Sequence, residues 1–155
     1  DLGKANEPVG KLDRGFGTDP EAVGDFVAAA VEALGEQGIG ATLKHFPGLG
    51  RVTEDTHTES ADLATDVETL AATDWVPFRE LMPTSGIFTM LAHARLTAVD
   101  REMPASFSAP VISGLLRGEW KHDGVLVTDL TGHAASQAGT RRPEAVHNPK
   151  RSRLR

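Results

Sequence analysis

Apolar residues follow two alternating patterns along this chain, helical spacing and short continuous runs. Between residues 20 and 34 they recur every three or four positions, as on one face of a helix, and Asp19-Pro20 is a typical helix start. The runs 39–46, 86–93 and 124–130 are too short for globular helices and end at turn residues, so they predict buried strands. The helical stripe consists of Val23, Phe26, Val27, Ala30, Val31 and Leu34.

Between the first and second predicted strands the sequence indicates a broken helical region. Thr65 and Glu68 have the spacing of a capping box, which marks a helix start. Pro77 divides this region because proline interrupts helical hydrogen bonding, and Thr73 or Asp74 is the candidate cap of a second piece that extends through residue 82.

A further helix is predicted before the third strand. It begins at Ser108-Ala109-Pro110, and its apolar stripe is Val111, Ile112, Leu115, Leu116 and Trp120. Helices that alternate with apolar strands predict an α/β fold with a parallel sheet covered by helices. A closed (β/α)8 barrel needs roughly 250 residues, so three strands indicate a partial TIM-like barrel or a smaller open sheet.

Several single residues carry an expectation about burial. We expect core or helix–sheet contacts at Phe46, Phe78, Phe88 and Trp120. Trp75 fits either the core or a rim. Solvated histidines are expected at His122, His133 and His147.

Composition and charge describe one globular domain with a distinct tail. The 155 residues are 39% hydrophobic and 25% charged. Residues 131–155 carry six Lys/Arg and one Glu and lack apolar periodicity, which predicts a basic, disordered tail after a domain at residues 1–130. Those first 130 residues carry 10 basic and 21 acidic side chains, an unfavourable balance for nucleic-acid binding.

The sequence leaves compartment and assembly open. It contains no apolar run long enough to cross a bilayer and no signal of the basic-then-apolar type. The absence of cysteine excludes disulfides and thiolate chemistry. The oligomeric state is not indicated.

Polar side chains stand at the end of each predicted strand. Lys44-His45 follows the first run, His93 the second and Asp129 the third. Because the carboxyl ends of parallel strands share one edge of a sheet or barrel, these endings are expected to converge on one site. A Phe-Pro-Gly turn at 46–48 leads into a polar loop with Asp55-Thr56-His57, so the same site is expected to receive an Asp-x-His pair.

Seven motifs follow one another in a fixed order from residue 1 to 130. They are Arg14-Gly15-Phe16-Gly17, Lys44 through Gly50, Asp55-Thr56-His57, Pro77-Phe78-Arg79-Glu80-Leu81, Ala92-His93, Pro104-Ala105-Ser106-Phe107-Ser108 and Gly124 through Asp129. Taken together, these motifs resemble glycoside hydrolase family 3, in particular its bacterial β-N-acetylhexosaminidase branch. The chain departs from the family at Leu49, where the family has a second histidine, and after Asp129, where Leu130-Thr131-Gly132 follows.

The resemblance implies a TIM-like barrel that removes terminal β-linked N-acetylglucosamine from cell-wall or chitin-type oligosaccharides with retention of configuration and without a cofactor. It implies that Asp129 is the nucleophile, that His57 is the acid/base and that Asp55 orients His57. Sugar-binding roles are implied for Arg14, Lys44, His45 and His93.

The chemistry of these residue types suits that reaction. A double-displacement glycosidase needs an ionised carboxylate as nucleophile and a second group that first donates and then accepts a proton. A histidine with an unperturbed pKa of ~6.5 is able to do both near neutrality. An aspartate two residues away is able to fix the tautomer of that imidazole.

Other interpretations of the same residues stay open. Lys44, His45, His93 and Asp129 at successive strand ends also fit a metal-dependent barrel hydrolase, although that class normally has a His-x-His on an early strand and this chain does not. A non-catalytic carbohydrate-binding remnant is a third possibility. Asp129 also suits a helix cap, and His93 also suits a packing role.

Overall fold

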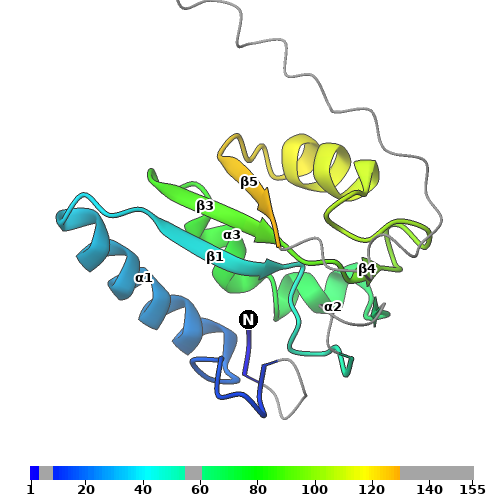
Figure 1. Ribbon diagram of the computed structural model, residues 1–155, viewed down its shortest axis with the longest axis horizontal. Helices are drawn as coiled ribbons and strands as arrows, with labels where there is room; N and C mark the ends of the chain where they lie inside the picture. Colours follow the sequence, from blue (N-terminus) through cyan, green and yellow to red (C-terminus); the bar gives the residue numbers. More distant parts are fainter. Residues whose placement is uncertain (4–8, 55–60, 130–155) are drawn as a thin grey trace, which may run out of the picture.

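The computed structural model describes residues 1–3, 9–54 and 61–129, which fold into parallel strands covered by helices (Figure 1). All the helices and strands expected from the sequence in this part of the chain are present, with ends that differ by a few residues. The elements are α1 (Pro20–Glu36), β1 (Ala41–Phe46), β2 (Asp62–Leu63), α2 (Val67–Ala72), α3 (Val76–Leu81), β3 (Ile87–Leu91), β4 (Arg95–Leu96), the π-type helix η1 (Pro110–Glu119) and β5 (Val125–Thr128).

The main sheet has three parallel strands in the order β1-β3-β5, so neighbours in space are also successive long strands of the chain (Figure 1). Helices connect them, and α1 packs along α3 on one side of the sheet. This arrangement confirms the predicted α/β class with a parallel sheet. A second, two-stranded parallel sheet joins β2 to β4, which the sequence did not indicate because each strand has only two residues.

The two faces of the main sheet differ in burial. Leu43 pairs with the fully buried Thr89 on the face that the helices cover. On the opposite face, Phe88 pairs with Val125, and these side chains are 39% and 52% exposed. The expectation that Phe88 is a core or helix–sheet contact is therefore wrong, because the pleat turns its side chain away from the helices.

Phe46 is the centre of an aromatic cluster that joins the sheet to its helices. Its ring is fully buried and lies 5.7 Å from Trp75, 5.5 Å from Phe78 and 5.5 Å from Trp120, measured between centroids. Trp75 is 1% exposed, so it belongs to the core and not to a rim. Its indole N–H donates to the carbonyl oxygen of Pro47, which satisfies the polar atom of a buried ring.

The helix starts are partly as expected. Asp19 caps α1, since its carboxylate accepts a hydrogen bond from the backbone N–H of Ala22. At α2 the cap is Asp66 and not Thr65, because the Asp66 carboxylate accepts from the backbone N–H of Thr69 at 2.8 Å. Neither Thr73 nor Asp74 caps α3, which begins after Trp75 without a side-chain cap.

His122 corrects another expectation, since its side chain is buried and not solvated. The imidazole lies against Gly124, where any side chain would overlap the ring. Burial lowers the pKa of His122, and the guanidinium of Arg117 lowers it further. The guanidinium also donates to the carbonyl oxygens of residues 122 and 124, which fixes the connection from η1 into β5. His133, His147 and the predicted tail at 131–155 lie outside the described residues.

In the part of the chain that the structure describes, no helix is both long and apolar enough to cross a membrane.

The aromatic cluster predicts a large stability difference between two identical substitutions. Phe46→Ala is expected to lower the free energy of unfolding by about 3–5 kcal/mol, because it leaves a cavity among three aromatic rings. Phe26→Ala is the matched control, since that ring is 56% exposed and contacts Phe16 at the surface. Urea unfolding of both variants measures the difference. Equal losses would contradict the central position of Phe46.

Candidate active site

The carboxyl ends of the three main strands lie side by side, as the sequence predicts. The backbone N–H of Ala92, just past β3, donates to the carbonyl oxygen of Phe46 at 2.8 Å. The backbone N–H of Asp129, just past β5, donates to the carbonyl oxygen of Leu91 at 3.2 Å. These bonds continue the sheet beyond its strands and fix the backbone that carries the polar residues.

His45 occupies an irregularity in β1. Lys44 pairs with Met90 and Phe46 pairs with Leu91, so β1 has one extra residue, His45, between two successive pairs. Such bulges redirect side chains at sheet edges. The peptide bonds Lys44–His45 and Phe46–Pro47 are both cis.

The imidazole of His45 lies between two carboxylates. Its Nδ1 is 2.8 Å from Oδ2 of Asp1, and its Nε2 is 3.6 Å from Oδ2 of Asp129. Burial lowers the pKa of His45 to about 4, with the charge of Asp129 acting in the opposite direction. The positive charges of Lys44 and Arg14 lower the pKa further. His45 is therefore a neutral imidazole at pH 7.

Asp1 is a site residue that the sequence did not reveal. Its carboxylate accepts hydrogen bonds from the backbone N–H groups of His45 and Leu49 in addition to the His45 ring. The side chain is 4% exposed. A single aspartate before an irregular segment has no local pattern that would single it out.

His93 follows the middle strand and is also held by another segment. Its side chain is 8% exposed, and its Nδ1 lies 2.7 Å from the hydroxyl of Ser106. The ring of Phe107 stacks on the imidazole at 6.0 Å with an interplanar angle of 11°. Ser106 is fixed in turn by its backbone N–H, which donates to the carbonyl oxygen of Ala92. His93 is therefore packed against Phe107 and also lies at the carboxyl end of β3, close to the other strand ends.

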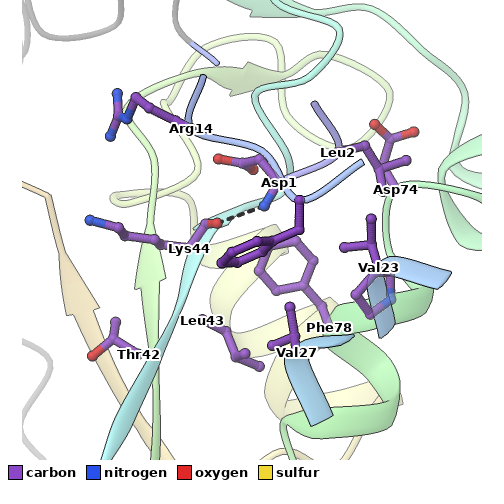
Figure 2. A pocket seen from close by; sticks show the side chains of 12 residues that line it. Asp1, Leu2, Arg14, Val23, Val27, Thr42, Leu43, Lys44, Asp74 and Phe78 are labelled. Carbon is purple, nitrogen blue, oxygen red and sulfur yellow. Dashed lines mark hydrogen bonds between the residues drawn. The ribbon is translucent and has the colours of Figure 1, made fainter. Parts of the chain in front are cut away.

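Arg14 and Lys44, both exposed, line a cavity of about 300 Å³ beside β1. Figure 2 shows them near Asp1, whose N-terminal amine donates to the carbonyl oxygen of Lys44 at 2.9 Å. The remaining wall is mostly apolar, with Val23 and Val27 from α1. The further lining residues are Leu2, Phe16, Thr42, Leu43, Asp74, Pro77 and Phe78.

The turn after His45 is anchored to the junction between α2 and α3. The guanidinium of Arg51 donates to the carboxylate of Asp74 at 2.6 Å and to the hydroxyl of Thr73 at 3.0 Å. These contacts explain why Thr73 and Asp74 do not cap α3. Leu49, at the position where the family has a second histidine, is fully buried.

Asp55 and His57 lie outside the described residues, so their predicted roles stay predictions. The segment that contains them follows the anchored turn and precedes β2.

The metal-ligand interpretation of the strand ends gains no support from the geometry. Asp1 and Asp129 approach opposite nitrogens of His45, so the three groups do not point to a common centre. Across residues 1–3, 9–54 and 61–129, no three His, Asp or Glu side chains gather closely enough to hold a metal ion.

Comparison with protein families identifies the fold. The model of the glycosyl hydrolase family 3 N-terminal domain matches residues 1–149. The chain belongs to this family. Its parallel α/β structure agrees with the TIM-like barrel that the sequence predicts for such a domain. The match continues past residue 130, and the predicted boundary there stays a prediction.

Individual relatives agree with this assignment. A β-hexosaminidase of Stenotrophomonas maltophilia is 40% identical over 147 residues, 95% of this chain and 43% of that protein. The β-N-acetylhexosaminidase structure from Beutenbergia cavernae has 39% identity and a TM-score of 0.74 over 87% of this chain and 39% of that one. NagZ from Neisseria gonorrhoeae in complex with N-trifluoroacetyl-D-glucosamine has 32% identity and a TM-score of 0.70 over 76% of this chain and 34% of that one. The chain spans about two fifths of the length of the curated relatives it matches.

The low pKa of His45 predicts an acid-sensitive contribution to stability. Because the folded pKa is about 4 and the ordinary value is 6.5, the unfolded chain binds a proton in this interval and the folded chain does not. Wild-type stability is therefore expected to fall by up to roughly 3 kcal/mol more than that of His45→Gln between pH 7 and pH 4. Urea unfolding across this range measures the gap. His122 acts in the same direction but is present in both proteins. Parallel stability profiles would refute the assignment.

Proposed function

We propose that this chain carries the catalytic face of a retaining glycoside hydrolase that removes terminal β-linked N-acetylglucosamine. The observation that carries the proposal is the convergence of strand ends: Asp129 lies 3.6 Å from His45, and Lys44 directly precedes His45 on β1. Family membership and relatives named β-hexosaminidase support this activity over other reactions that the same barrel catalyses.

In this proposal Asp129 is the nucleophile. Its side chain is 13% exposed, which leaves the carboxylate accessible at the edge of the sheet. In the first step a carboxylate oxygen bonds to the anomeric carbon while the glycosidic bond breaks, and His57 gives its proton to the departing oxygen. In the second step His57 takes a proton from water, the water oxygen bonds to the anomeric carbon, and the bond to Asp129 breaks. Asp55 holds the imidazole of His57 in the required orientation.

Four further residues bind the terminal sugar in this scheme. Lys44 and Arg14 donate hydrogen bonds to hydroxyl oxygens, while the imidazoles of His45 and His93 contact hydroxyls at the carboxyl edge. A neutral sugar needs directional donors and acceptors more than charge, and these four side chains are able to supply them.

The relatives support the proposed substrate class. N-trifluoroacetyl-D-glucosamine, present in the NagZ complex, is an N-acylated glucosamine and therefore supports recognition of N-acetylglucosamine. Cell-wall fragments and chitin-type oligosaccharides both carry this sugar, so we propose a role in peptidoglycan recycling or chitin breakdown. A non-catalytic sugar-binding chain is the alternative, and turnover distinguishes the two.

Asp129→Asn is expected to lower turnover of a chromogenic N-acetyl-β-D-glucosaminide by on the order of 10³-fold or more, since it removes the attacking oxygen anion. Asp123→Asn is the matched control. It makes the same change just before the first residue of β5, at the end of the strand opposite to Asp129. The measurement is initial rate with the wild type and both variants. Equal rates for the wild type and the Asp129 variant would remove Asp129 from the mechanism.

His57→Ala is expected to act differently on two substrates. With a poor leaving group, which needs a proton to depart, the rate of the first step falls about 10²–10⁴-fold. With a nitrophenyl leaving group, which departs without a proton, the rate of the first step falls much less. Added azide is expected to restore turnover of the activated substrate, because an anionic nucleophile needs no general base. The rate ratio between the two substrates is the measured quantity. An unchanged ratio would show that another residue supplies the proton.

A further inference from the structure

Asp1 is a buried carboxylate that none of the roles proposed so far uses. Its Oδ1 accepts from the backbone N–H of Leu49 at 2.9 Å. Its Oδ2 accepts from the backbone N–H of His45 at 3.0 Å and lies 2.8 Å from Nδ1 of the same residue. Burying a carboxylate is costly unless donors surround it, and here both oxygens have donors. Because two of these contacts are to His45, the position of the carboxylate indicates a role in fixing that residue.

Glycines allow the first segment of the chain to reach His45. A side chain at Gly50 would overlap the carbonyl oxygen of Leu2, and one at Gly15 would overlap the backbone of Gly3. The backbone N–H of Gly3 also donates to the carbonyl oxygen of Gly17. The segment is therefore held close to both the Arg14-to-Gly17 loop and the turn after β1, which fixes the Asp1 carboxylate against Nδ1 of His45.

The contact with Asp1 determines which nitrogen of His45 carries the proton. An ionised carboxylate only accepts hydrogen bonds, so Nδ1 must be the donor across the 2.8 Å contact. In a neutral imidazole the other nitrogen then has a lone pair and only accepts. Nε2 is the nitrogen that faces Asp129.

The surroundings favour the neutral ring. Burial is the largest cause that lowers the pKa of His45, and the charges of Lys44 and Arg14 act in the same direction. Two carboxylates face the ring, those of Asp1 and Asp129. The charge of Asp129 raises the pKa of His45, but burial outweighs it and the pKa is about 4. At 3.6 Å, Nε2 and the Asp129 carboxylate are beyond ordinary hydrogen-bonding distance, as expected for two acceptors.

We propose that Asp1 is a positioning residue that holds His45 in the neutral Nδ1–H tautomer, so that Nε2 accepts a hydrogen bond from a hydroxyl of the substrate sugar. This inference rests on the proposed function for the identity of the sugar, but the tautomer does not depend on it. A positively charged His45 beside Asp129 would make the carboxylate a weaker nucleophile. A neutral His45 avoids this loss of nucleophilicity.

His93 shows why the carboxylate matters. Its Nδ1 contacts the hydroxyl of Ser106, which is able to donate or accept and therefore does not impose a tautomer. Asp1 imposes one. His45 and His93 therefore differ in whether a neighbouring group fixes the tautomer, and NMR spectra of the imidazole rings report the tautomer.

The test is long-range ¹H–¹⁵N correlation NMR of the histidine rings in the whole chain, from pH 4 to 8. The wild type is expected to show His45 as the Nδ1–H tautomer at pH 7, without protonation above pH 5. Asp1→Ala is expected to shift His45 toward the Nε2–H form that free imidazoles favour. Affinity for N-acetyl-D-glucosamine, measured by titration in the same samples, is expected to fall roughly 10–100-fold with loss of the charged hydrogen bond.

Asp100→Ala is the matched control. That carboxylate also accepts from two backbone N–H groups, those of Glu102 and Met103, and from one side chain, Ser108, but it does not contact His45. The His45 spectrum should not change in this variant. An Nε2–H tautomer or an imidazolium in the wild type at pH 7 overturns the proposal, even if Asp1→Ala does not fold. A wild type that shows the expected spectrum but does not bind N-acetyl-D-glucosamine overturns the proposed function and not the role of Asp1.

Discussion

The continuation of β1 against β3 past an irregularity is the constraint on which the rest of the structure depends. Phe46 points into the core and its carbonyl oxygen accepts from Ala92, so the strand stays paired after His45 has been inserted. One residue therefore faces the site while the next anchors three aromatic rings. Because both positions share one short backbone segment, core packing and site geometry are fixed together.

The same segment explains how the site tolerates buried polar groups. The Asp1 carboxylate and the His45 imidazole are each about 95% buried, yet every oxygen of Asp1 has a donor. A neutral imidazole costs less free energy to bury than an imidazolium, so burial favours the neutral ring. The contact with Asp1 then determines which nitrogen of the neutral ring carries the proton. The stability that this arrangement contributes near neutrality is lost in acid, which links the chemistry of the site to the folding of the domain.

Patterns within one stretch of sequence predict the three strands of the main sheet, the Asp19 cap and the convergence of His45 with Asp129, but not the two-residue strands β2 and β4. Such patterns do not predict features that depend on contacts between residues far apart in the sequence. Asp1 reaches the site because glycines far along the chain let it approach, and no local signal reports that. The predictions for Phe88 and His122 are wrong for the same reason, because residue type alone does not show which face of a sheet is covered or whether a glycine leaves room for a ring.

Two kinds of contact fix the described residues around the proposed site. The proposed nucleophile, Asp129, and the proposed sugar-binding histidines, His45 and His93, stand at strand ends, where the sheet fixes the backbone. The segment that carries Asp55 and His57 is instead bounded by two ion pairs, Arg51 with Asp74 before it and Arg95 with Asp62 after it. The backbone N–H of Arg95 also donates to the carbonyl oxygen of residue 61. These contacts fix the described residues on either side of that segment, Arg51 before it and residues 61 and 62 after it.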